Sequence, residues 1–146
     1  MRNNLKIYLA GKMSGLSFDD MNNWRVEIKE LLNISSMFYK GNLDIVNPVD
    51  YYNFQTKLHQ SEKEVHDYEL KHVTTSDIII VNLDGLCSSD GTKIELREAY
   101  VNNIPVIAFG NKNIYNDLHP WIKLYITRVE DNMNEIVDYI RDFYLA

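Results

Sequence analysis

The stretch DIIIVNL at residues 77–83 decides the fold class of this chain. Its β-branched residues follow one another without a polar interruption, which is typical of a strand buried on both faces. Such strands belong to parallel sheets whose two faces are covered by helices. Helices are predicted on both sides of the stretch. Ser61 and Glu64 form a capping box for a helix that ends near Thr75, and another helix runs from about residue 92 to 103.

Four further segments along the chain are predicted to be strands. They are residues 5–10 (LKIYLA), 44–47 (DIVN), 104–109 (IPVIAF) and the short segment 125–129. The first stops at Gly11 and the second is closed by Pro48. Strands that alternate with helices argue for a parallel sheet between two helical layers. We therefore expect one α/β domain over residues 1–146, with about five parallel strands.

The remaining helices are predicted from caps and apolar spacing. Ser17 and Asp20 form a capping box for the first helix. Its buried face is predicted to carry Met21, Trp24, Ile28 and Leu31. A helical turn is expected at residues 118–123, and the apolar face of the last helix carries Met133, Ile136, Val137, Ile140 and Phe143. Residues 48–60 show no clear period and are predicted to form a loop.

Composition and charge exclude several classes of protein. The 146 residues are 45% hydrophobic and 25% charged, as in an ordinary globular domain, which excludes intrinsic disorder. A net charge of −6 argues against binding nucleic acid through phosphate contacts. No apolar run approaches the ~18–20 residues of a membrane span. The N-terminal apolar stretch is interrupted at Gly11 and Lys12, so it is not a secretion signal.

The cysteine and histidine content gives no sign of a metal. Cys87 is the single cysteine, so neither an intrachain disulfide nor a Cys-rich zinc site is expected. A reducing, cytoplasmic setting is the simplest expectation. His66 and His72 are interpreted as surface residues, and no group of side chains has the spacing of metal ligands. We expect neither a metal nor a cofactor.

Ligands of such sheets bind at the carboxyl ends of the strands, near the point where the strand order reverses. That rule selects residues 11–15, 47–53, 84–95 and 110–116. In the first segment, Gly11 and Gly15 flank Lys12 and Ser14. A glycine-containing turn of this kind can hold phosphate or sugar oxygens on backbone N–H groups, or it can simply be a tight turn into the next helix.

The third segment, SSDGTKIE at residues 88–95, is the most informative. Thr92 and Glu95 have the spacing of a capping box, which alone would explain both. Asp90 and Glu95 also lie at a predicted helix N-terminus, where the helix dipole favours an ionised carboxylate that could act as a nucleophile. The preceding helix offers Asp67 and Glu69 as a second acid. They lie about 200° apart around the helix, so both cannot face one pocket.

The chain resembles the nucleoside 2-deoxyribosyltransferase family over roughly residues 5–110, with a plausible continuation into the C-terminal helix. The resemblance rests on the order and spacing of YLAG at residues 8–11, NP at 47–48, DIIIV at 77–81, DGTxxE at 90–95 followed by Ala99, and IPVI at 104–107. The DGTxxE stretch is its most specific part. The usual ELGYA of the family reads ELREA at residues 95–99 here, so this helix is more charged.

The resemblance implies a flavodoxin-like domain that cleaves the bond between a nucleobase and a 2′-deoxyribose, with a role in nucleoside salvage. It implies that Glu95 attacks the anomeric carbon, and that Tyr8 orients it. The position that handles the proton of the departing base is Glu69, where the family usually has Asp, and Asp67 is the alternative. The substrate-binding positions implied by the resemblance are Gly11, Asn47, Asp90, Gly91 and Asn111.

The resemblance also implies partners. Deoxynucleosides and free nucleobases are the expected substrates, and no nucleic acid or membrane is expected. A homo-oligomer with shared active sites is implied, because the segment after the fourth strand often completes a neighbouring subunit's pocket in this family. Asn111 or Asn113 would serve that purpose here.

Two other functions remain open from the sequence. Nucleoside 5′-monophosphate N-glycosidases resemble the transferases but have a small hydroxyl residue near the 5′-oxygen. Asp90 favours a free 5′-hydroxyl, because a carboxylate and one phosphate charge repel by about 4 kcal/mol at ~4 Å. We therefore expect deoxynucleosides to react ahead of their monophosphates and ahead of ribosides. A phosphate site built from Lys12, Ser14, Ser88 and Ser89 is the alternative.

The other open function is a non-catalytic flavodoxin-like module that binds a nucleotide or a sugar. A phosphoacceptor receiver domain, with Asp84 as its acceptor, is one form of it. Receivers need an acidic pair after the first strand, whereas this chain has GKMS at residues 11–14.

Overall fold

One sheet of five parallel strands organises the structure, a computed structural model that describes residues 4–52 and 56–145. The strands are β1 (Asn4–Ala10), β2 (Asn42–Val46), β3 (Ile78–Asn82), β4 (Val106–Phe109) and β5 (Arg128–Glu130). Their order across the sheet is β2-β1-β3-β4-β5, and every neighbouring pair is parallel. This is the strand order of flavodoxin-like folds, which confirms the expected fold class. The order reverses between β1 and β3, so the switch point lies there.

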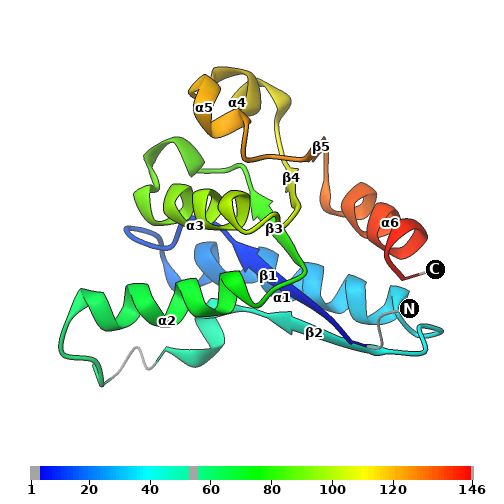
Figure 1. The fold of residues 1–146 in the computed structure, drawn as a ribbon, viewed down its shortest axis with the longest axis horizontal. Helices are drawn as coiled ribbons and strands as arrows, with labels where there is room; N and C mark the ends of the chain where they lie inside the picture. Colours follow the sequence, from blue (N-terminus) through cyan, green and yellow to red (C-terminus); the bar gives the residue numbers. More distant parts are fainter. Residues whose placement is uncertain (1–3, 53–55, 146) are drawn as a thin grey trace.

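Helices cover both faces of the sheet (Figure 1). On one face lie α1 (Phe18–Ser35) and α6 (Met133–Phe143), and on the other lie α2 (Glu62–Thr74) and α3 (Asp90–Val101). The connections contain the short helices η1 (Pro48–Tyr51), η2 (Leu86–Ser88), α4 (Lys112–Asp117) and α5 (Pro120–Lys123).

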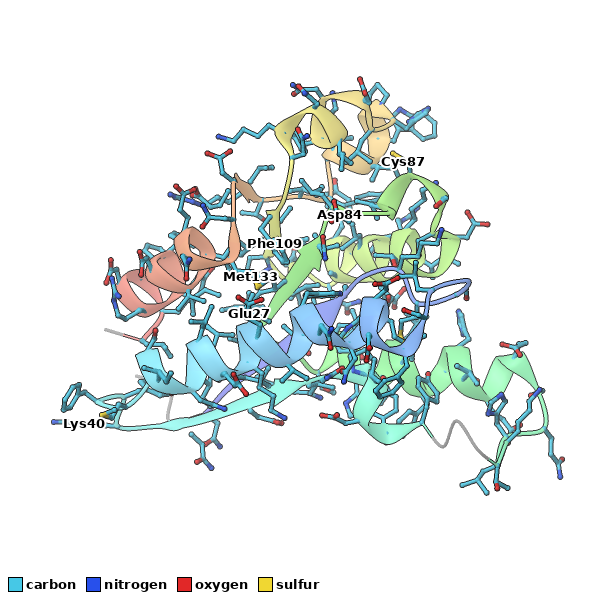
Figure 2. All side chains as sticks on the ribbon, turned by 180° about the vertical axis from the view of Figure 1, so that it is seen from behind. Glu27, Lys40, Asp84, Cys87, Phe109 and Met133 are labelled. Carbon is cyan, nitrogen blue, oxygen red and sulfur yellow. The ribbon has the colours of Figure 1, made fainter. Side chains whose placement is uncertain are left out.

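Alternating side chains of the strands build two hydrophobic cores. Ile7, Leu9 and Ile107 point toward α1 and α6, where they meet Leu32 and Ile136. Figure 2 shows this layer from behind, with Phe109 and Met133 between the sheet and α6. The opposite core contains Tyr8, Ile79 and Val81 with Leu96 and Ala99 of α3. All five residues of β3 are buried, as its uninterrupted apolar stretch predicts.

Helix α1 is rotated relative to its predicted face. The buried residues are Met21, Arg25, Ile28 and Leu32, whereas Trp24 and Leu31 are only partly buried. The prediction of the buried face was therefore wrong at two of four positions. Sequence spacing favoured Trp24 because it is apolar, but Arg25 takes the central position.

Helix α3 begins earlier than predicted. Its N-cap is Ser89, whose hydroxyl accepts a hydrogen bond from the backbone N–H of Thr92 at 3.4 Å. Glu95 is therefore beyond the first turn, and the predicted capping box of Thr92 and Glu95 is wrong. The capping box of Ser61 and Glu64 is confirmed, because each side chain bonds the other's backbone N–H. Ser17 accepts from the backbone N–H of Asp20 at 3.1 Å.

The predicted loops are partly helical. Residues 48–60 contain η1, and residues 110–116 contain most of α4. Residues 53–55, within the first of these loops, lie outside the described residues. The last strand is shorter than expected and spans Arg128–Glu130. Among residues 4–52 and 56–145, no helix is long and apolar enough to cross a membrane.

Candidate active site

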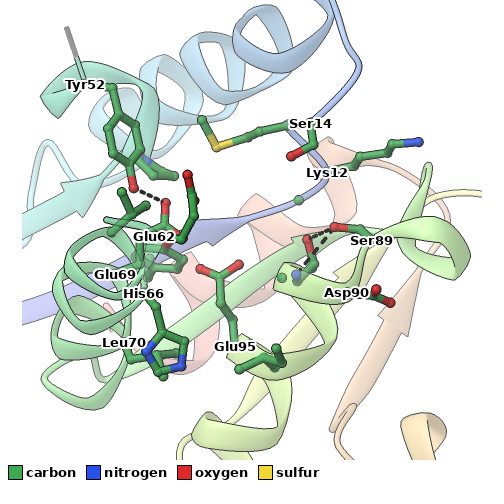
Figure 3. A pocket seen from close by; sticks show the side chains of 18 of the residues that line it. Lys12, Ser14, Tyr52, Glu62, His66, Glu69, Leu70, Ser89, Asp90 and Glu95 are labelled. Carbon is green, nitrogen blue, oxygen red and sulfur yellow. Dashed lines mark hydrogen bonds between the residues drawn. The ribbon is translucent and has the colours of Figure 1, made fainter. Parts of the chain in front are cut away.

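A cavity of about 550 Å³ opens at the carboxyl end of the sheet, on the side of α2 and α3. It lies beside the switch point between β1 and β3, where the topology of the sheet predicts a ligand. The segment after β1, the end of η1, one face of α2 and the start of α3 line it (Figure 3). Four ionisable side chains come together in it from four different elements: Tyr8, Arg25, Glu69 and Glu95.

Glu95 extends from α3 into this cavity, and its residue is only 6% exposed. Its Oε2 atom has no hydrogen-bond partner among the described residues. Burial raises the pKa of Glu95 to about 8, and the charge of Glu69 adds to the rise, while a hydrogen bond from Tyr8 and the charge of Arg25 oppose it. The helix dipole, which the sequence suggested would favour ionised Glu95, therefore adds little here, since dipole effects fade beyond the first turn and burial dominates.

Glu69 reaches the cavity from α2. The hydroxyl of Tyr52 donates a hydrogen bond of 2.6 Å to its Oε1 atom (Figure 3). Burial raises the pKa of Glu69, and the Tyr52 bond and the charge of Arg25 oppose the rise. Asp67, the alternative acid, is exposed and pairs with Lys63 at 2.6 Å and with His66 at 2.9 Å. Of the two alternatives, Glu69 is the one that lines the cavity.

Tyr8 lies on β1 and is 1% exposed. Burial and the neighbouring charge of Glu95 raise the pKa of its hydroxyl well above the ordinary range, so it stays protonated and can donate. Tyr51 lies behind it, with a buried hydroxyl that has no hydrogen-bond partner among the described residues. The Tyr8 hydroxyl, the carboxyl groups of Glu69 and Glu95 and the Arg25 guanidinium thus form one polar cluster in the cavity, with Tyr51 adjacent to it.

Arg25 is the member of this cluster that the sequence prediction missed. It is 0% exposed and occupies the buried stripe of α1. An arginine at a core position of an amphipathic helix was the available signal, because arginine is almost never fully buried without partners. The predicted face was instead built from the apolar residues Met21, Trp24, Ile28 and Leu31.

A second polar group lies at the start of α3. The Lys12 ammonium donates a hydrogen bond of 2.9 Å to the Ser88 hydroxyl, and Ser14 and Ser89 line the same side of the cavity. Asp90 is exposed in the first turn of α3, and its carboxylate points away from Glu95 (Figure 3). Asp90 also lines this side of the cavity, so the structure places hydroxyl groups and an ammonium beside the Asp90 residue there.

Several predicted substrate-binding residues are separated by the fold. Gly11 and Gly91 line the cavity, but Asn47 and Asn111 do not. The Asn47 side chain accepts from Val49 N at 3.0 Å and donates to Asn22 at 2.9 Å, so it holds η1 in place. Asn111 is the N-cap of α4. A role for Asn111 in a neighbouring pocket stays a prediction.

No metal centre is formed by the described residues. Within 4–52 and 56–145, no three His, Cys, Asp or Glu side chains are grouped to hold an ion. The site offers instead one buried and one half-buried carboxyl group with different partners, and the buried one has an oxygen without a hydrogen-bond partner among the described residues. Such a pair can divide the roles of nucleophile and general acid, because their environments separate their proton affinities.

Comparison with known proteins identifies a family and related folds. The sequence model of the family described as nucleoside 2-deoxyribosyltransferase matches residues 7–134. In a sequence search, no curated protein matches the chain.

Solved structures share the fold at low sequence identity. A conserved protein from Enterococcus faecalis V583 superposes with a TM-score of 0.71 at 21% identity, covering 94% of this chain and 98% of its own. A 2-deoxyribosyltransferase from Bacillus psychrosaccharolyticus gives 0.66 at 18%, covering 92% and 91%. A CMP N-glycosidase from Clostridium botulinum gives 0.58 at 16%, covering 96% and 99%.

Proposed function

The chain belongs to the nucleoside 2-deoxyribosyltransferase family, and on that premise we propose that it cleaves the N-glycosidic bond of 2′-deoxynucleosides and transfers the sugar to another nucleobase. The observation that carries the proposal is Glu95, a buried carboxyl group that enters the cavity with an unpartnered oxygen. An orphaned buried acceptor costs folding free energy, so its retention points to a chemical role. Glu69, in the same cavity, is available as the proton donor.

The first half of the reaction forms a covalent intermediate. The reactive form of the pair has its proton on Glu69 and a carboxylate at Glu95. A lone pair of the Glu95 carboxylate bonds to the anomeric carbon, and the bond between that carbon and the base nitrogen breaks, with its electrons going to the base. Glu69 delivers its proton to the departing base, while Tyr8 holds the other carboxylate oxygen. The transition state resembles an oxocarbenium ion, which the nearby negative charge stabilises.

The second half releases the sugar. A nitrogen of the incoming base attacks the anomeric carbon from the opposite face, and the ester oxygen returns to Glu95 as a carboxylate. The proton of the incoming base passes to Glu69, which restores the starting state. Two successive displacements retain the configuration, as in retaining glycosidases. Water in place of the base would give hydrolysis.

Trapping and substitution test this proposal. The protein is incubated with deoxyadenosine and cytosine, product bases and nucleosides are followed by chromatography, and the quenched protein is searched by mass spectrometry for a deoxyribosyl ester on Glu95. Glu95→Gln should lower the rate by about a thousandfold or more. Glu98→Gln, on the same helix but outside the cavity, is the matched control. Near-normal transfer by Glu95→Gln would refute the assignment.

A second candidate is hydrolysis of 2′-deoxynucleoside 5′-monophosphates. It is favoured by the Lys12 ammonium on Ser88, next to Ser89 at the N-terminus of α3, while Asp90 points outward. Helix N-termini and ammonium groups both favour phosphate. The decisive measurement is kcat/KM for a deoxynucleoside against its 5′-monophosphate. Lys12→Met should reduce the monophosphate value selectively, with Lys112→Met as the control, and a ratio that favours the nucleoside would exclude this candidate.

We also propose a cytoplasmic homo-oligomer with shared active sites. The proposal rests on membership of the family and, for the compartment, on the single exposed cysteine, Cys87.

A further inference from the structure

Arg25 is a charged residue that is fully buried at a position where the fold needs only an apolar side chain. Its side chain is fully buried on the core stripe of α1, at a position where its neighbours on that stripe are Met21 and Ile28. An apolar residue of the same length would fill this place without the cost of removing a charge from water. That cost amounts to several kcal/mol for an ion in a protein interior.

Main-chain carbonyls hold the guanidinium in one orientation. Its Nε donates to Leu9 O at 3.3 Å, its Nη2 donates to Gly11 O at 3.0 Å, and its Nη1 donates to Met21 O. The indole of Trp24 covers its face, with 4.5 Å between the guanidinium carbon and the ring centroid. Gly11 also leaves room for the guanidinium, because a Cβ at this position would lie 3.4 Å from Nη2 of Arg25.

These partners satisfy hydrogen bonds but leave the positive charge unbalanced. The accepting carbonyls carry no formal charge, and within the described residues Arg25 forms no ion pair within 4.0 Å. A guanidinium has five N–H donors, so two donors remain beyond the three bonds. The side chain lines the cavity together with Glu69 and Glu95. The charge that balances Arg25 is therefore supplied by that pair.

The groups around the two carboxyl groups come from several elements. They are Tyr8 from β1, Tyr51 of η1 and the adjacent Tyr52, His66 on α2 and Arg25 from α1. The acidic residues Glu62 and Asp90 line the same cavity and are exposed. The tyrosines are neutral donors, and His66 is exposed and bonded to Asp67. Lys12 also lines the cavity, with its ammonium on Ser88. Arg25 is the permanent, buried cation of this group.

We propose that Arg25 is a positioning residue of the reaction, whose fixed positive charge allows one of Glu69 and Glu95 to ionise while the other keeps its proton. The inference rests on the proposed function, in which one carboxylate attacks and one carboxylic acid donates. One cation, one carboxylate and one acid make a neutral buried cluster. Removal of Arg25 would leave a lone buried carboxylate, and both groups would then hold protons at neutral pH.

A carbon NMR titration tests the inference without reference to catalysis. Protein labelled with δ-¹³C glutamate is titrated between pH 4 and 10, and the signals of Glu69 and Glu95 are assigned with Glu69→Gln and Glu95→Gln. Arg25→Met should raise the lower apparent pKa of the pair by about one unit or more, the smaller end of the effect of an adjacent arginine. Arg25→Lys should restore most of the shift, and Arg97→Met, an exposed arginine of α3, should leave it unchanged.

Arg25→Gln covers the case in which Arg25→Met does not fold, because its amide can still donate to a carbonyl. A folded Arg25→Met or Arg25→Gln protein with the titration of the unmodified protein would overturn the inference. The second readout is the pH dependence of kcat/KM, whose acidic limb should move upward with the same lower pKa. If the protein proves to have no glycosidic activity, the NMR titration still shows whether Arg25 controls the ionisation of the pair. Failure of the proposed function and failure of this inference are therefore distinguishable.

Discussion

Replacing Glu95 with glutamine should remove activity and, at the same time, stabilise the fold in alkaline solution. The folded protein holds the pKa of Glu95 at about 8, against an ordinary value of 4.5. As the pH rises between these values, the unfolded chain releases a proton that the folded chain keeps. Because the unfolded state then binds fewer protons, the free energy of unfolding falls with rising pH. A glutamine at position 95 does not titrate, so the variant does not lose this part of its free energy of unfolding as the pH rises.

The structure sets the size of the effect. Each pKa unit corresponds to about 1.4 kcal/mol, so the three units from pH 5 to pH 8 give an upper limit of about 4 kcal/mol. Glu69 interacts with Glu95 and shares part of the rise, which reduces the expected effect to about 2–4 kcal/mol. Glu95 is nearly fully buried, so solvent does not screen the loss. Above about pH 8 both states are ionised, and no further loss follows.

Urea denaturation at pH 5, 6, 7 and 8, followed by tryptophan fluorescence, measures the effect. The quantity of interest is the free energy of unfolding of Glu95→Gln minus that of the unmodified protein. It should increase by about 2–4 kcal/mol between pH 5 and pH 8, whatever the constant cost of the new amide. Glu98→Gln should show no comparable trend. An identical difference at both ends of the range would refute the argument that burial raises the pKa of Glu95.

Three further predictions concern Gly11, Tyr52 and association. Gly11→Ala would place a Cβ 2.7 Å from an indole carbon of Trp24 and should lower the free energy of unfolding by about 1–3 kcal/mol in the same denaturation assay. Gly91→Ala, whose new Cβ would have no atom within 4 Å, should leave that free energy unchanged. Tyr52→Phe removes a donor that lowers the pKa of Glu69, so the alkaline limb of the pH–rate profile should move upward, and an unmoved limb would contradict this. Activity should depend on association of the subunits. A fully active monomer in sedimentation experiments would contradict a shared active site that includes Asn111.

The sheet could be predicted from the sequence because its signals are local. The uninterrupted apolar run at residues 77–83, the turns at Gly11 and Pro48, and the capping box of Ser61 and Glu64 each act within a few residues. The topology rule for parallel sheets then locates a site at the carboxyl ends of the strands. The cavity lies there, and Tyr8, Glu69 and Glu95 line it as expected.

The start of α3 was mispredicted because two residues competed for the cap. Ser89 and Thr92 are both residue types that cap helix N-termini well, so the sequence alone allows the helix to begin after either one. The structure begins the helix after Ser89, which turns Asp90 outward and moves Glu95 inward. Because the helix starts three residues earlier than predicted, Glu95 of the DGTxxE stretch is a buried acid rather than part of the helix cap.

The sequence therefore determined the order of the elements, the parallel sheet and the acidic residues that line the cavity. The tertiary structure established their electrostatics. The pKa of Glu95 depends on its burial and on the side chains of Tyr8, Glu69 and Arg25, which come from three other elements. Local patterns report hydrogen bonds and packing between near neighbours in the chain, whereas desolvation and charge act through space. For that reason Arg25, which lies far from both carboxyl groups in the sequence, is found beside them in one cavity only in the folded protein.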